Sequence, residues 1–263
     1  MVGIGTLINV AAVLLGTGVG VALGGRLPDR IRSAVMAMLG MFTIVMGIAD
    51  ALDTFGDVLE GALGRVAVLV VLGSLIIGGI VGELIDIEGR LASLGEWLRT
   101  RVARTERVAV PGRGPGAAAS TPEVSAAHGT NRFVEGFVLA SMVFCVGPLT
   151  ILGSLSDGLD GNYQLLAVKS LLDGFAGMAF ASVFGIGVGF SILPIIVVQG
   201  GITLLAVQLD GVLTEPMIAG IGALGGFLVL GIGLRLLELR PIRVANLLPG
   251  LVIVPVVIAV LTS

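Results

Sequence analysis

A charged pair lies inside an apolar part of the sequence. Lys169 is the only lysine of the chain, and after Asp173 no formal charge follows until Asp210. The lysine and the aspartate are one helical turn apart, so in a helix they share a face and can pair. Charged side chains within membrane helices face a protein interior or a water-filled cavity, and they commonly mark ion or substrate pathways. We interpret Lys169 and Asp173 as a functional ion pair; a structural clamp that locks helices together is the alternative.

Other polar groups occur in the neighbouring apolar segments. Asn9 and Gln199 carry amides, which in a membrane either belong to a site or link two helices by hydrogen bonds. Gly147-Pro148 interrupts a further segment, and a proline there frees backbone carbonyls for a neighbour or an ion; a packing kink is the alternative. The candidate substrate-binding or ion-coupling residues are Lys169, Asp173, Glu135, Asp157, Gln199, Ser154, Ser170 and Asn9.

A short polar stretch at 156–162 is predicted to form an external turn. It contains Asp157 and Asp160 but lacks the length and ligand spacing of a dedicated calcium loop. We expect a solvated turn in which Asp160 or Asn162 caps the next helix; a cation bound by the two carboxylates is the alternative. Asp157 is expected to line the external entrance of the site, and Glu135 the cytoplasmic one.

The composition indicates an all-α, polytopic membrane protein. Apolar residues make up 56% of the chain and charged residues 13%, against about 25% charged residues in a soluble domain. The single cysteine excludes an internal disulfide, and with one histidine a zinc or copper site of protein ligands is not expected. The sequence shows no catalytic arrangement. We expect no enzyme activity, no resident metal or cofactor, and no nucleic-acid partner.

Charge-free runs predict about eight membrane-spanning helices, near 2–23, 33–51, 65–85, 134–155, 162–185, 191–208, 216–235 and 244–262. The run 174–209 must turn, because as one helix it would extend about 54 Å against a hydrocarbon core of roughly 30 Å. The glycines at 185–189 mark the turn. Short motifs shared by helices 1 and 6 and by helices 2 and 7 suggest an inverted repeat of helices 1–3 and 6–8, with chance similarity as the alternative.

Arginines predict the orientation. All of them except Arg65 fall in or next to the loops after the first, third and seventh predicted helices, whereas the opposite loops carry aspartate and glutamate. By the positive-inside rule the arginine side is cytoplasmic and both termini are outside. The loop at 88–131 is thus cytoplasmic. It is predicted to hold an amphipathic helix on the membrane surface and a flexible linker at 111–130, which divides the chain into units at 1–87, 88–131 and 132–263.

Glycines at spacing four form small-residue faces in several predicted helices, for example Gly16, Gly20 and Gly24. Such faces allow helices to approach closely. We expect them to serve packing within the chain; a homo-oligomer is the alternative.

Several ordered blocks of sequence carry a family resemblance. They are Gly5-Thr6-Leu7-Ile8-Asn9, Leu27-Pro28, Phe133-Val134-Glu135-Gly136-Phe137-Val138, Phe144-Cys145-Val146-Gly147, Gly153-Ser154-Leu155-Ser156-Asp157-Gly158, Lys169-Ser170-Leu171-Leu172-Asp173-Gly174, Gln199-Gly200-Gly201-Ile202-Thr203-Leu204 and Arg243-Val244-Ala245-Asn246-Leu247-Leu248-Pro249. Together they resemble the YqgA/YdfK-type bacterial inner-membrane proteins, the domain-of-unknown-function 554 family. The resemblance covers nearly the whole chain except roughly 105–130. It implies a multi-pass bacterial inner-membrane protein, with recurrent polar positions at Glu135, Ser154, Asp157, Lys169, Asp173 and Gln199, and it supplies no activity.

The broken helix, the polar helix after it and the suggested repeat favour an ion-coupled transporter of a small solute. In this hypothesis Lys169 binds an anionic group or exchanges its partner, and Asp173 holds Lys169 or carries a proton. The partners are then the lipid bilayer and a small solute or ion. A membrane scaffold that transports nothing and a passive ion channel are the alternatives.

Overall fold

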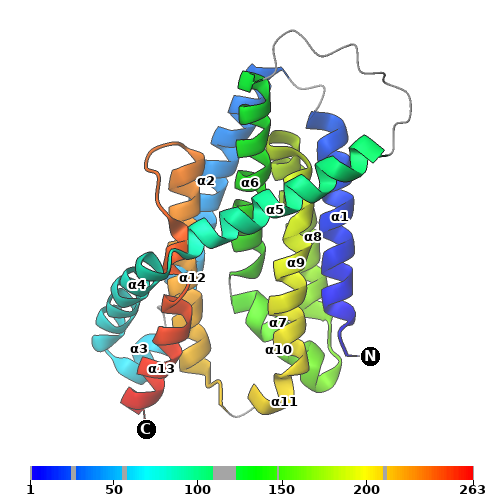
Figure 1. The fold of residues 1–263 in the computed structure, drawn as a ribbon. Coiled ribbons are helices and arrows are strands. Elements are labelled where there is room, and N and C mark those ends of the chain that lie inside the picture. Colours follow the sequence, from blue (N-terminus) through cyan, green and yellow to red (C-terminus); the bar gives the residue numbers. More distant parts are fainter. Residues whose placement is uncertain are drawn as a thin grey trace, which may run out of the picture.

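The computed structural model describes residues 2–24, 28–54, 58–108, 123–146, 148–209 and 212–262, and these residues are helical with no strand among them. Figure 1 shows the helices as a bundle with both chain ends at one end of the molecule. The elements are α1 (Ile4–Gly24), α2 (Asp29–Thr54), α3 (Glu60–Leu63), α4 (Val66–Ile85), α5 (Ile87–Val108), α6 (Glu123–Cys145), α7 (Pro148–Asp160), α8 (Gln164–Phe184), the 3₁₀ segment η2 (Gly185–Ser191), α9 (Ile192–Ile195), the π-helical segment η3 (Ile196–Gly200), α10 (Gly201–Leu204), α11 (Ala206–Leu209), α12 (Glu215–Leu236), the 3₁₀ segment η4 (Val244–Leu247) and α13 (Gly250–Thr262).

Six helical segments in the described part of the chain are long and apolar enough to cross a bilayer. They are Ile4–Gly24, Ser33–Leu52, Val66–Ile85, Gln164–Leu204, Glu215–Leu236 and Val244–Thr262. A seventh span results if the bent pair Arg132–Cys145 and Leu149–Asp160 crosses as one unit. The chain is therefore a multi-pass, all-helical membrane protein. The count of eight spans stays a prediction.

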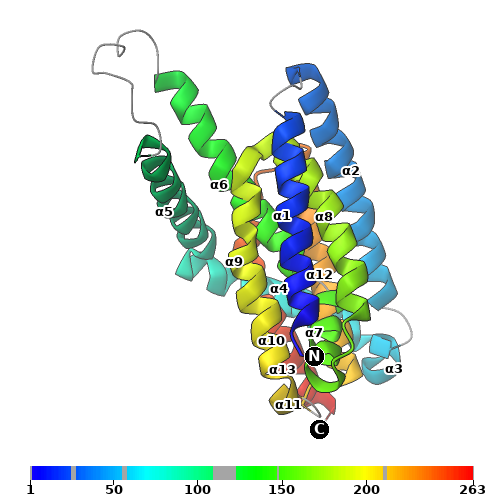
Figure 2. The ribbon, with the colours of Figure 1, turned by 90° about the vertical axis from the view of Figure 1, so that its right-hand side faces the viewer.

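The long segment Gln164–Leu204 reverses direction within its length, as the glycine pattern predicts. Helix α1 shows this, because it lies beside both legs of the reversal (Figure 2). Gly16 and Gly24 of α1 meet the backbones of Gly174 and Ser182, so α1 and α8 run parallel. The second leg runs the opposite way along α1, because Gly189 meets Thr17 and the later Gln199 bonds the earlier Asn9. The turn begins at Gly185, whose φ of +80° is readily adopted only by glycine.

The expected linker at 111–130 is only partly tested. Its residues 111–122 lie outside the described part of the chain, but α6 begins at Glu123, so 123–130 is helical rather than a flexible coil. The alanines and the glutamate of this stretch are good helix formers. The amphipathic segment forms α5 as expected, but it packs on α6 through Gly95 and the buried Leu98, which leaves Trp97 half exposed.

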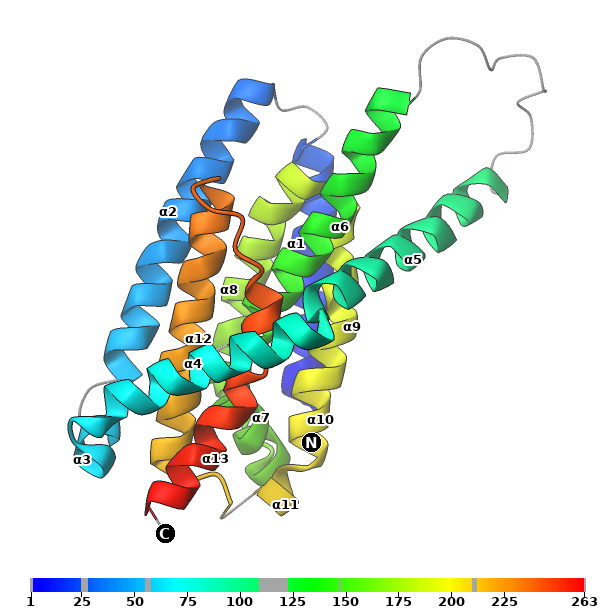
Figure 3. The same cartoon turned by 60° about the vertical axis from the view of Figure 1, so that its left-hand side comes forward.

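Helices from both expected membrane units interleave. Helix α1 packs along α8, α2 along α12, and α4 along α13 (Figure 3). The α1–α8 contact is lined by Gly16, Gly20 and Gly24, and a Cβ at each of them would collide with a backbone carbonyl of α8. The small-residue face of α1 thus serves packing within the chain. The division into three units stays a prediction.

The α1–α8 contact gives a prediction about stability. Gly16→Ala is expected to lower the free energy of unfolding by about 1–3 kcal/mol, because the new methyl group overlaps the carbonyl oxygen of Gly174 and the helices must separate. Gly18→Ala is the matched control, because Gly18 lies on the same helix with open space around it. Thermal unfolding of the two variants in detergent measures the difference. Equal melting temperatures of Gly16→Ala and Gly18→Ala would contradict the close α1–α8 contact.

Candidate functional site

Lys169 and Asp173 form a buried ion pair on one face of α8. The Lys169 ammonium donates hydrogen bonds to a carboxylate oxygen of Asp173 and to the main-chain carbonyl of Phe144, the latter at 2.7 Å. Both charged residues are only 6% exposed. A pair this deep in an apolar bundle is costly to form and is stable only when hydrogen bonds complete it. The sequence-based placement of both side chains toward the protein interior is confirmed.

Two amides extend the ion pair into a network. The Asn9 side-chain nitrogen donates to Asp173 at 2.9 Å and to the Gln199 side-chain oxygen at 3.0 Å, and both amide residues are fully buried. We call Asn9, Lys169, Asp173 and Gln199 the polar centre. Each amide also keeps one polar atom without a partner among the described residues, namely Asn9 Oδ1 and Gln199 Nε2. The centre therefore offers an unused acceptor and an unused donor, which a bound polar molecule could satisfy.

Two interrupted helices supply parts of the polar centre. Helix α6 ends at Cys145 and α7 starts at Pro148, with a bend of 61° between the two. The bend leaves the carbonyl of Phe144 near the helix end, where Lys169 bonds it. Gln199 lies in the π-helical segment η3, and such short π segments often occur at functional sites. The sequence pointed to this group, because the missing N–H of Pro148 is the one that would have bonded the carbonyl of residue 144 in a continuous helix.

Asp157 is placed differently from the predicted external turn. It lies in the last turns of α7 and is completely buried, and its Oδ2 accepts a hydrogen bond from the Gly5 amide at 3.2 Å. The carboxylate therefore caps the N-terminus of α1, where helix amides need an acceptor. Its Oδ1 has no partner among the described residues. The predicted solvated turn is wrong, because α7 continues to Asp160. Asn162 behaves as expected: its side-chain oxygen accepts from Gln164 at the start of α8.

The remaining candidate residues lie outside the polar centre. Ser170 is buried but its hydroxyl donates to the Leu166 carbonyl of its own helix. Ser154 is buried on α7, one turn before Asp157, and its hydroxyl has no partner among the described residues. Glu135 is part-buried and lines a separate cavity of about 450 Å³ together with arginines of the α12–η4 connection.

The cavity beside Glu135 contains a residue that sequence reasoning missed. Glu88, at the start of α5, accepts from Arg235 at 2.5 Å and from the Ala245 amide at 3.3 Å, while its own amide donates to the Asn246 side chain. These bonds fasten α5 to the C-terminal helices. The separation of more than a hundred residues between Glu88 and its partners leaves no local signal in the sequence.

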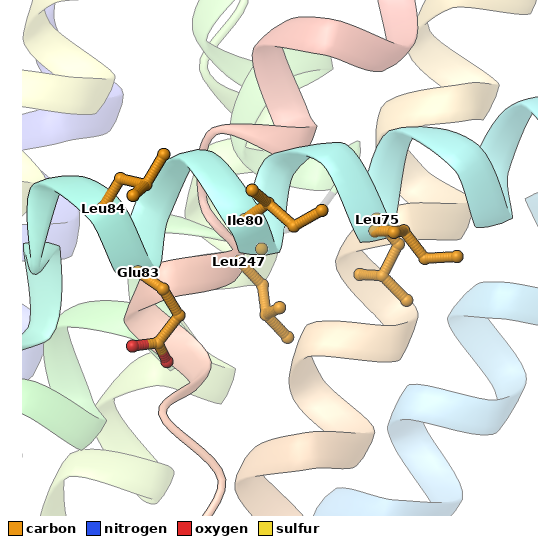
Figure 4. A pocket seen from close by; sticks show the side chains of 7 residues that line it. Leu75, Ile80, Glu83, Leu84 and Leu247 are labelled. Carbon is orange, nitrogen blue, oxygen red and sulfur yellow. The ribbon is translucent and has the colours of Figure 1, made fainter.

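A groove on the outer face of α4 is apolar and unrelated to the centre. Leu75, Ile80, Leu84 and Leu247 line it, with Glu83 at its side (Figure 4), and its volume is about 570 Å³. The Glu83 carboxylate is more than half exposed and faces Arg243 at 3.4 Å. The lining suits the lipid-facing surface of a membrane helix rather than a site for a polar solute.

Comparisons with known proteins agree with the resemblance seen in the sequence. The family described as "Protein of unknown function (DUF554)" matches residues 4–259. The "Uncharacterized membrane protein YdfK" of Bacillus subtilis (strain 168) is 28% identical over 258 residues, which cover 98% of this chain and 96% of the relative. The "Uncharacterized protein YqgA" of Escherichia coli (strain K12) is 28% identical over 250 residues, or 95% of this chain and 94% of the relative. No solved structure matches.

Proposed function

The chain belongs to the DUF554 family, and we propose that it is a bacterial inner-membrane transporter of a small solute, coupled to an ion. The observation that carries the proposal is the polar centre itself, a buried charge pair joined to amides from α1 and η3. Secondary transporters place their substrates where helices are discontinuous and backbone groups are free. Two of the elements around the polar centre are discontinuous in this way, namely the α6–α7 break and the π-helical segment η3. A membrane scaffold would need the ion pair to hold its helices together, but it would not need buried amide atoms without hydrogen-bond partners.

Lys169 is the anchor for the solute in this proposal. Its ammonium would bind an anionic group of the solute in exchange for, or in addition to, the Asp173 carboxylate. Asn9 Oδ1 and Gln199 Nε2 would bind further polar atoms of the same molecule. The four residues are at most 6% exposed, so a solute reaches them only when packed helices move apart. The mechanism therefore requires alternating access rather than an open pore.

The antiparallel contact of α2 and α12 supports the proposed inverted repeat. A Cβ on Gly47 would lie 2.7 Å from the Gly226 carbonyl, and one on Gly226 would lie 2.6 Å from the Gly47 carbonyl. A Cβ on Gly40 would likewise lie 3.2 Å from the Gly233 carbonyl, and one on Gly233 would lie 3.0 Å from the Gly40 carbonyl. An inverted repeat requires the second and seventh predicted helices to run in opposite directions, and this contact has that arrangement.

A ligand screen tests the proposed function. The purified protein is heated in the presence of single small anionic solutes, including mono- and dicarboxylates, inorganic phosphate and amino acids. A solute that binds the folded state raises the melting temperature by mass action. We expect at least one such solute and expect its effect to vanish in the Lys169→Met/Asp173→Leu variant. A panel of this breadth without any stabilising solute would favour the scaffold.

The orientation is a separate proposal with its own prediction. Both termini are placed outside and the α5 side in the cytoplasm, in line with the arginine distribution. In a Cys145→Ser background, cysteines at the exposed positions 159 and 212 are expected to react with an impermeant thiol reagent added outside intact cells. Cysteines at the exposed positions 100 and 239 are expected to react only after the cells are opened. The reverse pattern would overturn the orientation.

A further inference from the structure

Helix capping does not fully account for the buried carboxylate of Asp157. It is 0% exposed, and among the described residues no lysine, arginine or histidine pairs with its carboxylate. One oxygen caps α1 through Gly5, but the other oxygen has no partner there. An isolated buried carboxylate is expensive to keep charged unless a cation or hydrogen bonds compensate it. The first turn of a helix supplies only part of that compensation.

The elements next to this carboxylate carry buried hydroxyls without hydrogen-bond partners among the described residues. Ser154 lies one turn before Asp157 on the same face of α7, and Gly158 packs directly against the Thr203 carbonyl of α10. Thr6 follows the capped Gly5 on α1. The hydroxyls of Ser154, Thr203 and Thr6 are at most 7% exposed and have no hydrogen-bond partner among the described residues. Helices α1 and α10 both pack on α7, so the three elements that carry these hydroxyls meet in the region of Asp157.

We propose that Asp157, with the hydroxyls of Ser154 and Thr203 and oxygens of the surrounding backbone, binds a sodium ion. Oxygen ligands suit a hard cation, and a single carboxylate matches one positive charge, whereas calcium sites commonly collect several carboxylates. The site also lies in the last turns of α7, where the negative end of the helix dipole favours a cation.

The sodium site deepens the proposed function and rests on it for its coupling role. Gln199 of the polar centre and Thr203 are one turn apart in the same leg of the reversal, and Asn9 is one turn beyond Gly5 on α1. The two sites thus share the elements α1 and η3–α10. A bound ion that fixes these elements would order the solute-binding amides, which couples the two binding events without direct contact between ligands.

Thermal unfolding of the purified protein at constant ionic strength tests sodium binding, with choline chloride replaced stepwise by sodium chloride. We expect a saturable rise of the melting temperature of roughly 3–6 °C and a smaller rise with potassium chloride. Asp157→Asn is expected to lose the response and still to fold, because asparagine also caps a helix and removes the buried charge. Asp160→Asn is the control, since it removes the same charge from an exposed position three residues away and should keep the response.

Two further variants make the test decisive. Thr203→Val keeps the shape of the side chain and should shift the half-saturating sodium concentration upward by tenfold or more. Lys169→Met/Asp173→Leu should retain the sodium response, which separates this site from the polar centre. An absent sodium response in the wild type, or one that persists in Asp157→Asn, would overturn the site and leave the transport proposal standing. A stability difference between wild type and Asp157→Asn that depends on pH but not on sodium would assign the carboxyl a proton instead.

Discussion

Lys169→Met is expected to destabilise the protein more than Lys169→Met combined with Asp173→Leu. The single replacement leaves the Asp173 carboxylate buried at 6% exposure with no cation beside it. Breaking a buried pair in this way costs about 3–5 kcal/mol, whereas replacing both partners by apolar side chains of similar size is often neutral or stabilising. The Phe144 carbonyl loses its partner in both variants, so this loss does not change which variant is the less stable.

Unfolding temperatures of the two variants and the wild type in detergent measure this difference. Arg99→Met is the matched control, because Arg99 pairs with Glu96 at a half-exposed position on α5, where an ion pair contributes only about 0–1 kcal/mol. The control should unfold close to the wild type. If Lys169→Met unfolded no earlier than the double variant, the buried pair would not be the energetic unit that the geometry indicates.

Asn9→Leu is expected to have the second largest effect, because Asn9 is the link between the ion pair and η3. Its removal leaves the Gln199 side chain and one Asp173 hydrogen bond unsatisfied in the interior, and each unsatisfied group costs about 1–3 kcal/mol. The variant should unfold earlier than the wild type and bind the solute of the ligand screen at least tenfold more weakly.

Thr17→Val provides the comparison for Asn9→Leu. Thr17 is buried on the same helix, two turns further along, and its hydroxyl has no partner among the described residues. Removal of an unpaired hydroxyl should be neutral or slightly stabilising and should leave solute binding unchanged. A similar loss of binding in both variants would mean that any disturbance of α1 acts on the site, and that Asn9 has no special part in it.

The polar centre was largely predictable because its members are polar residues in apolar surroundings. Lys169 and Asp173 are one turn apart, and the amides of Asn9 and Gln199 interrupt long apolar runs, so each signal is local. Asp157 was not predictable in the same way. Its partner is the Gly5 amide, 152 positions away, and a sequence with two aspartates and two glycines in seven positions is equally typical of a turn.

Local sequence patterns also predict part of the fold, whereas the packing between distant helices has no local signal. The length of the run 174–209 and its glycines predict the reversal at η2, because a bilayer limits the length of one span. The start of α6 was placed too late, since the Gly/Ala/Ser-rich stretch before it resembles a linker in composition. The pairing of α1 with α8 and of α2 with α12 depends on which glycine faces meet, and that is set by the whole bundle.

Solute uptake into proteoliposomes tests the central claim most directly. The solute found in the ligand screen is supplied outside vesicles that contain either the wild type or the Lys169→Met/Asp173→Leu variant, at equal protein content and after the variant has been shown to fold. The proposed function predicts uptake by the wild type that saturates with solute concentration, and none above protein-free vesicles for the variant. Equal uptake by the folded double variant would contradict the assignment of the polar centre as the transport site.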